Sequence, residues 1–336
     1  MRIVLVSAAL MFLAFPALSQ AKWEVTNTFH IGGEGGWDYT TVDSATHRIF
    51  VTRGTHTMAI DATSGKVLGD IPGQVRAHGV ALVPALNRGF ITDGGGSGAI
   101  VIFDLKTYAV LGKIAAMPDS DGIIYDSGTN RVLAVSGDGN KLMTFDPAID
   151  PANGTMDPPI DLGGSPEFLA VDGKGKAYVN LADKDLVAEV DLHSRTVLAR
   201  WSIAPGGHPT GIAIDAARHR IFVGARKPQN LIVMDTNNGK IVGALAIGSG
   251  VDANQFDDGQ AFASCGDGSL TVAGEHGGSF SVEQVVKTAP GARTMGVDHS
   301  THTLYLPTAE LEPATTPNGR PRPKPGTFMI VVVSRR

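Results

Sequence analysis

Residues 206–247 decide the fold of this chain: GGHPTGIAIDAARHRIFVGARKPQNLIVMDTNNGKIVGALAI. Four short apolar or alternating segments follow one another in this stretch, at residues 211–214, 220–223, 230–235 and 240–246. Asp, Asn and Gly lie between them, and these residues tolerate the positive φ of tight hairpins. The stretch therefore predicts a four-stranded antiparallel sheet. Because one such sheet cannot bury both of its faces alone, we expect copies elsewhere in the chain.

Copies of this unit recur along the chain. Residues 42–50 match residues 214–222 closely, and residues 60–68 match residues 234–242. Weaker copies lie at residues 82–90, 125–133, 171–178, 256–262 and 297–305. The equivalent positions are Asp43, Val83, Asp126, Asp172, Asp215, Asp257 and Asp298. Their mean spacing of about 42 residues is typical of a four-stranded propeller blade, so seven units are predicted.

The whole mature chain is predicted to form one domain, residues 22–336. Gly (42 residues) and Pro (19 residues) are frequent, and no run indicates an amphipathic helix, as expected for an all-β fold. Unit one covers about residues 35–73 and unit two about residues 76–116. The last unit ends with its third strand, residues 328–333, and the strand of residues 23–31 precedes the first unit. We therefore predict a seven-bladed β-propeller of four-stranded antiparallel blades, closed by the N-terminal strand completing the last blade.

Residues 1–21 are predicted to be a signal peptide. Arg2 provides a positive charge, residues 3–15 are apolar, and Ser19-Gln20-Ala21 resembles a cleavage site. The apolar run is too short for a comfortable membrane span, and no second one follows. A periplasmic or secreted protein without a membrane span after signal cleavage is expected.

Cysteine content and charge restrict the possible chemistry. Cys265 is the single cysteine, so no disulfide can form within the chain, and a small buried thiol is expected. The sequence has no Cys-x-x-Cys-His, which excludes covalently attached haem c. The formal net charge of -5 argues against general nucleic-acid binding.

Several phrases carry a family resemblance. They are Ala177-Tyr178-Val179-Asn180, the run from His208 to Asp215, and the Asp-x-x-(Ser/Asn)-Gly-Lys-Val/Ile turns at residues 61–67 and 235–241. The chain resembles the YVTN-repeat (YncE-like) seven-bladed β-propellers over most of residues 23–333. The resemblance implies a periplasmic propeller. It implies no catalytic residues, because family members are variously binding proteins, surface-layer proteins, and relatives of enzyme subunits and lactonases.

The mouth of the central channel is the predicted site. Positions five residues before the equivalent points should meet there, and all are polar: Asp38, His78, Asp121, Glu167, Thr210, Asp252 and Arg293. Two residues further back lie Arg76, Asp119 and His208, and Trp37 precedes Asp38 as a candidate aromatic wall.

Three interpretations of this ring remain open. In the first, a divalent cation is held by Asp38, His78, Asp121, Glu167, His208 and Asp252. Oxygen ligands suit Ca²⁺, Mg²⁺ or Mn²⁺, and a second imidazole favours Zn²⁺ or Cu²⁺. In the second, Arg76 and Arg293 neutralise the carboxylates in a water-filled channel without a ligand. In the third, a small molecule binds against Trp37, Arg76, Asp119, Thr210 and Arg293, with a carboxylate or His78 as general base.

The favoured function is that of a binding or interaction protein whose partner is an unknown protein or a small-molecule ligand. The channel mouth and adjoining loops would form the binding surface, including the basic, proline-rich residues 312–326, which are predicted to form an extended loop without strand or helix. The alternative is a metal-dependent hydrolase or lyase, similar in architecture to gluconolactonase-type propellers. No Gly-x-Ser-x-Gly motif supports serine chemistry.

Overall fold

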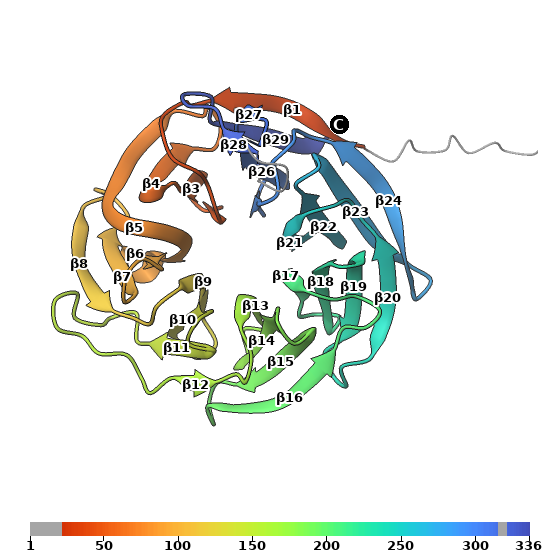
Figure 1. Cartoon of the computed structure of the whole chain (residues 1–336), viewed down its shortest axis with the longest axis horizontal. Helices are drawn as coiled ribbons and strands as arrows, with labels where there is room; N and C mark the ends of the chain where they lie inside the picture. The colour runs from red at the N-terminus through yellow and green to blue at the C-terminus, as the bar shows by residue number, and fades with distance from the viewer. Residues whose placement is uncertain (1–21, 315–320) are drawn as a thin grey trace, which may run out of the picture.

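The computed structural model describes residues 22–314 and 321–336; the predicted signal peptide lies outside these residues. The described residues are all-β, with one 3-10 turn, η1 (Pro84–Leu86), as their only helical element. No helix in these residues has the length and apolar character needed to cross a membrane. Figure 1 shows the sheets arranged radially around a common centre, like the sectors of a ring.

Five of the sheets have four antiparallel strands each. The first contains β9 (Ser120–Asp126), β10 (Arg131–Ser136), β11 (Lys141–Phe145) and β12 (Ile160–Asp161). The second contains β13 (Pro166–Val171), β14 (Lys176–Leu181), β15 (Leu186–Asp191) and β16 (Thr196–Ser202). The third contains β17 (Pro209–Asp215), β18 (Arg220–Arg226), β19 (Gln229–Asp235) and β20 (Ile241–Ala246). The fourth contains β21 (Val251–Asp257), β22 (Gln260–Cys265), β23 (Ser269–His276) and β24 (Ser279–Lys287). The fifth contains β25 (Gly296–Asp298), β26 (Thr303–Thr308), β29 (Met329–Arg335) and β1 (Trp23–His30).

The four strands predicted within residues 206–247 are confirmed as β17, β18, β19 and β20. Their first hairpin turns because the Asp215 carboxylate accepts the backbone N–H groups of Ala217 and Arg218, both at 3.1 Å. His219 closes this turn at φ 57°, the left-handed conformation that such hairpins require. The equivalent points in the other units also lie at strand ends: β2, β5, β9, β21 and β25 end there, and β13 ends one residue earlier.

A seven-stranded sheet occupies the remaining sector. It contains β2 (Thr40–Asp43), β3 (Arg48–Thr52), β4 (Gly54–Asp61), β5 (Val67–Val83), β6 (Arg88–Asp93), β7 (Ala99–Asp104) and β8 (Val110–Ala115). The long strand β5 pairs with β4 through its first part, as in Ile71 with Thr57, and with β6 through its last part, as in Ala81 with Phe90. The sequence predicted two separate strands here; the chain between them stays extended, so one continuous strand serves both neighbours.

The two ends of the chain lie in one sheet. Strand β1 pairs antiparallel with β29, and Lys22 and Arg336 exchange two backbone hydrogen bonds of 3.0 Å. Trp23 is buried and packs edge-to-face on Phe262 of β22, with ring centroids 4.9 Å apart. The Gln284 side chain on β24 also bonds the backbone N–H and C=O of Trp23. Strand β1 is therefore attached to its own sheet and to the preceding one.

The core consists of hydrophobic clusters between adjacent sheets. In one cluster, Ile212, Ile221 and Ile232 from β17, β18 and β19 pack on Tyr178 and Val187 of the preceding sheet. Such face-to-face packing is the reason that one unit needs its neighbours. Cys265 is buried as predicted, and burial raises the pKa of its thiol to about 12, so the thiol is not poised to react.

The proline-rich segment differs from its prediction. Strands β27 (Leu311–Glu312) and β28 (Arg322–Pro323) form a short antiparallel pair, although the prolines were expected to exclude strand structure. A proline is tolerated at the edge of so short a ladder because its missing N–H can face solvent. The Lys324 ammonium also binds the Glu310 carboxylate at 2.9 Å.

Candidate functional site

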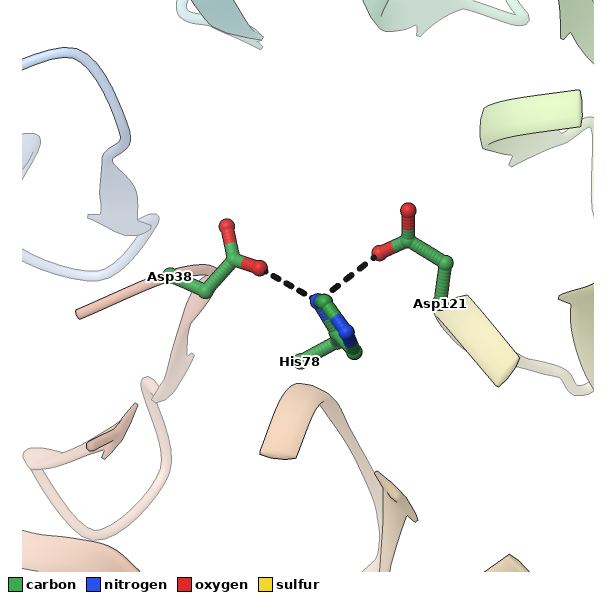
Figure 2. Close-up of side chains that lie close together, drawn as sticks. All are labelled: Asp38, His78 and Asp121. Atoms are coloured by element: carbon green, nitrogen blue, oxygen red, sulfur yellow. Dashed lines mark hydrogen bonds and ion pairs between the residues drawn. The ribbon is translucent and has the colours of Figure 1, made fainter. Parts of the chain in front are cut away.

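Asp38, His78 and Asp121 converge at the channel mouth (Figure 2). They come from three successive innermost positions of the fold, just before β2, within β5 and within β9. His78 Nδ1 lies 2.6 Å from Asp38 Oδ2 and 3.4 Å from Asp121 Oδ1. One ligand atom from each residue lies within 4.8 Å of the other two. Residues separated by about 40 positions in sequence thus form one compact donor set.

Three hydrogen bonds fix the backbone of this set, two from second strands and one from Thr294, which precedes the innermost strand β25. The Thr52 hydroxyl on β3 donates to the carbonyl of His78 at 2.7 Å. In the next sector, the Thr92 hydroxyl on β6 donates to the carbonyl of Asp121 at 2.5 Å. The carbonyl of Asp38 accepts from the Thr294 hydroxyl at 2.9 Å. The three functional residues are therefore tied to the strands beside them.

The hydrogen bond from a second-strand side chain to a backbone carbonyl at the mouth recurs further around the ring. We did not predict it from the sequence. Asn180 on β14 donates to the carbonyl of Thr210 at 2.7 Å, and Ser264 on β22 donates to the carbonyl of Arg293 at 2.5 Å. A visible signal did exist, because each of these second strands begins with Arg, Lys or Gln and then carries a run of uncharged, mostly apolar residues that ends in Thr, Asn or Ser. Such a buried polar residue needs a partner, and the partner is the next mouth position.

Burial and like charges shape the electrostatics of the donor set. Burial raises the pKa of Asp38, although its hydrogen bond and ion pair with His78 act in the opposite direction. Burial together with the negative charges of Asp38 and Glu167 raises the pKa of Asp121 well above its ordinary value. The phenol of Tyr39 also has a pKa well above its ordinary value, because it is buried beside Asp121 and Asp38. The negative charges of the Asp38 and Asp121 carboxylates are thus poorly compensated by positive charge nearby.

Two polar atoms of the set have no hydrogen-bond partner among the described residues. They are His78 Nε2 and Asp121 Oδ1, and both are buried. His78 is only 8% exposed, and Nε2 faces the backbone near Gly94. Unsatisfied buried polar atoms are uncommon in native proteins and often occur at functional sites.

Two further carboxylates predicted as ligands lie at the mouth but outside the set. Both oxygens of Asp252 bind guanidinium groups, one from Arg226 and one from Arg293, the latter at 2.5 Å. Burial raises the pKa of Glu167, while the positive charge of Arg226 partly offsets this shift. Arg226 lies at the end of β18 and not at an innermost position, so counting back from the equivalent points does not give it.

The remaining predicted residues lie outside the donor set. Arg76 forms an ion pair of 2.8 Å with Asp119, and Trp37 is buried against Phe328 with Arg293 5.9 Å above its ring. Thr210 is also buried, and its hydroxyl donates to the Val251 carbonyl at 2.9 Å. The exposed His208 donates its backbone N–H to Asp185 and does not join the donor set.

The donor set can bind a cation or exchange protons. Two carboxylates and one imidazole are a common combination of ligands for a divalent metal ion. Tyr39 and Phe168 lie below the set and pack with ring centroids 4.6 Å apart, although they belong to different sheets, so they narrow the channel under the mouth. The donor set is therefore polar and mostly buried, with aromatic rings on one side of it.

Radial four-stranded sheets around a channel define the chain as a β-propeller. Its fold matches two solved structures at low identity. One is Kuenenia stuttgartiensis hydrazine synthase, with a TM-score of 0.70, 12% identity, and coverage of 82% of this chain and 94% of that chain. The other is U3-55K, with a TM-score of 0.75, 11% identity, and coverage of 92% and 99%. These matches concern the fold alone.

The chain is also similar in sequence to the uncharacterized protein YncE. It is 30% identical over 129 residues to YncE of Escherichia coli O157:H7 and of Escherichia coli strain K12. The match covers 37% of this chain and spans only 35% of the length of either relative. No family model matches the chain.

Proposed function

We propose that this chain is an exported, YncE-like, seven-bladed β-propeller that acts as a binding protein. Its channel mouth holds a divalent cation on Asp38, His78 and Asp121 and presents that cation to a small-molecule or protein ligand. The observation that carries the proposal is the convergence of these three side chains, with His78 Nδ1 within 3.4 Å of both carboxylates.

The strand pairing supports seven blades and a closed ring. Strand β5 is long enough to serve as the outer strand of one blade and the inner strand of the next, so the seven-stranded sheet counts as two blades. Together with the five four-stranded sheets this gives seven. The pairing of β1 with β29 supports closure by the N-terminal strand, which would leave no unpaired edge between the chain ends.

Charge supports a cation in the donor set. Asp252 and Asp119 each have arginine partners, whereas Asp38 and Asp121 share a single imidazole. A divalent ion between these two carboxylates would compensate their charge and occupy the lone pairs of the buried oxygens. Two carboxylates suit Mn²⁺ by ligand type, and His208, the second imidazole that would point to Zn²⁺ or Cu²⁺, lies outside the set.

Export is supported by sequence features outside the described residues. The apolar run of residues 3–15 and the small residues before Lys22 fit a cleaved signal. The similarity to YncE and the single, buried cysteine are compatible with a periplasmic or secreted protein. Expression of the full chain with fractionation, followed by N-terminal sequencing, would locate the mature end.

Metal titration tests the cation site. Isothermal titration of the metal-free protein with Mn²⁺ should give one site per chain. In thermal melts, Mn²⁺ at 100 times its Kd should stabilise the fold by about 2.7 kcal/mol. Asp38→Asn and His78→Gln should each weaken Mn²⁺ binding at least tenfold, since each removes a ligand.

The matched control is His276→Gln. His276 also pairs with a carboxylate, that of Glu283, but it lies on the outer part of the fold and its side chain is 62% exposed. This variant should bind Mn²⁺ like the parent. Absence of binding by the folded parent, or equal weakening by His276→Gln, would contradict the proposed site.

A second candidate function is a metal-dependent hydrolase or lyase. The observation that favours it is the position of Glu167 beside the donor set, where burial raises its pKa, because a carboxyl in such a position can serve as a general acid or base. Manganese-dependent opening of simple lactones, lost in Glu167→Gln while Mn²⁺ binding persists, would favour this function over binding alone.

A further inference from the structure

A second cavity occupies the channel on the far side of Tyr39 and Phe168. Its volume is about 440 Å³, and every innermost strand, β2, β5, β9, β13, β17, β21 and β25, contributes to its wall. The wall is formed by the later residues of these strands, toward the hairpins that end at Asp43 and its equivalents. The cavity therefore lies toward the face opposite the polar mouth.

The side chains that line this cavity are mostly apolar, although the sequence led us to expect a polar channel, and polar atoms form a smaller but substantial share of its exposed wall. Partly buried apolar residues project from the inner edges of the blade cores into this region: Val42, Leu82, Tyr125, Val171, Ile214 and Phe256. Among residues 22–314 and 321–336, no Asp, Glu, Lys or Arg lines the cavity. Its one ionisable imidazole, His299, is held by Asp257 through Nδ1 at 2.9 Å.

Two aromatic rings narrow the channel between its two ends. The Tyr39 and Phe168 rings pack at 4.6 Å between centroids, and the space beside them has a volume of only about 20 Å³. That volume holds about one water molecule. Asp38, His78 and Asp121 are not among the residues that line the cavity, so a molecule bound there would lie apart from the donor set.

We propose that this cavity is a second ligand site, which binds a small, uncharged and largely apolar molecule independently of the cation site. Its volume lies within the range of small-molecule pockets, about 300–1,000 Å³. The uncharged wall matches an uncharged ligand, because a charged group would lose hydration without gaining an ion pair. The Thr41 hydroxyl donates to the Val80 carbonyl at 2.7 Å and the Gln255 amide nitrogen to the Met295 carbonyl at 3.4 Å, so the oxygens of these two side chains would orient the ligand as acceptors.

The uncharged dye N-phenyl-1-naphthylamine tests the proposal, because its fluorescence rises in apolar surroundings. The folded parent should bind it saturably at one site, and removal of metal by EDTA should leave this binding unchanged. The anionic dye 8-anilino-1-naphthalenesulfonate should bind at least tenfold more weakly. No saturable binding of the uncharged dye, or equal binding of both dyes, would overturn the proposal.

Three variants locate the dye. Leu82→Lys places a charge in the cavity wall, and Gln255→Trp fills the cavity without adding charge; each should weaken dye binding at least tenfold. Leu198→Lys is the matched control, since Leu198 lies on the outer strand β16 and is 51% exposed. Melting curves establish which variants fold. If Leu82→Lys does not fold, dye binding by Gln255→Trp tests the proposal. Unchanged binding in a folded cavity variant, or equal loss in Leu198→Lys, would place the dye elsewhere.

Discussion

At the scale of single residues, the donor set could be predicted because it follows from the repeat. Counting five positions back from Asp43, Val83 and Asp126 gives Asp38, His78 and Asp121, and these three side chains meet. The count gave Asp252 in the same way, but its carboxylate is bound by Arg226 and Arg293. Arg293 is itself one of the counted positions, and its neutralisation of carboxylates was one of the three interpretations, whereas Arg226 reaches Asp252 from the end of β18, which the count does not give.

Asp257 provides a test of pH dependence at this scale. Burial alone would raise the pKa of Asp257, but hydrogen bonds from His299 and His302 outweigh burial, and the pKa is lowered. A lowered pKa means that this carboxylate stabilises the fold above its unfolded pKa of about 3.9, and that the contribution is lost as pH falls through its folded value. Asp257→Asn should therefore destabilise the protein by about 1–2 kcal/mol at pH 6 and progressively less below pH 4.

Chemical denaturation between pH 3 and pH 7 measures this difference. Asp258→Asn is the control, because Asp258 is the next residue, its side chain is 50% exposed, and its ion pair with Arg335 is a surface contact. Its effect should stay below about 0.5 kcal/mol at every pH. A constant difference between Asp257→Asn and the parent across this range would show that the charge of Asp257 does not stabilise the fold.

At the scale of strands, periodicity and turn residues predicted most elements. The four strands of residues 206–247 and the N-terminal strand are present because alternating apolar residues and Asp, Asn or Gly turns specify them locally. The continuous strand β5 and the short pair β27 and β28 were not predicted. Each depends on hydrogen bonds to distant or edge segments, which local sequence does not reveal.

Removal of β1 tests the role of the N-terminal strand. A mature chain that begins at Gly32 would lose all β1 pairing with β29 and the buried Trp23 side chain. Burial of a large aromatic side chain alone is worth about 3–5 kcal/mol, so the truncated chain should melt at least 10 °C lower or fail to fold.

A circular permutant tests whether stability depends on the presence of β1 or on where the chain begins and ends. Lys22 and Arg336 are hydrogen-bonded neighbours, so joining them through a short linker and opening the chain between Gly277 and Gly278 keeps every β1 contact. This permutant should fold and melt close to the parent. A truncated chain as stable as the parent would contradict closure by β1.

At the scale of the whole molecule, the radial arrangement brings distant segments to one axis and gives the channel two unlike ends. The mouth combines carboxylates, an imidazole and guanidinium groups, whereas the opposite end is an apolar cavity. The sequence predicted the polar end from the innermost positions. It did not predict the apolar end, because whether an inner residue faces the channel or a neighbouring blade depends on the packing of all the sheets.

The most direct measurement of the proposed cation site is anomalous diffraction from crystals of the metal-free protein soaked in Mn²⁺. We predict one strong anomalous peak at the channel mouth, about 2.0–2.6 Å from a carboxylate oxygen of Asp38, an imidazole nitrogen of His78 and a carboxylate oxygen of Asp121. The peak should disappear in Asp121→Asn crystals. No peak at these three residues, with Mn²⁺ bound elsewhere or not at all, would contradict the proposed site.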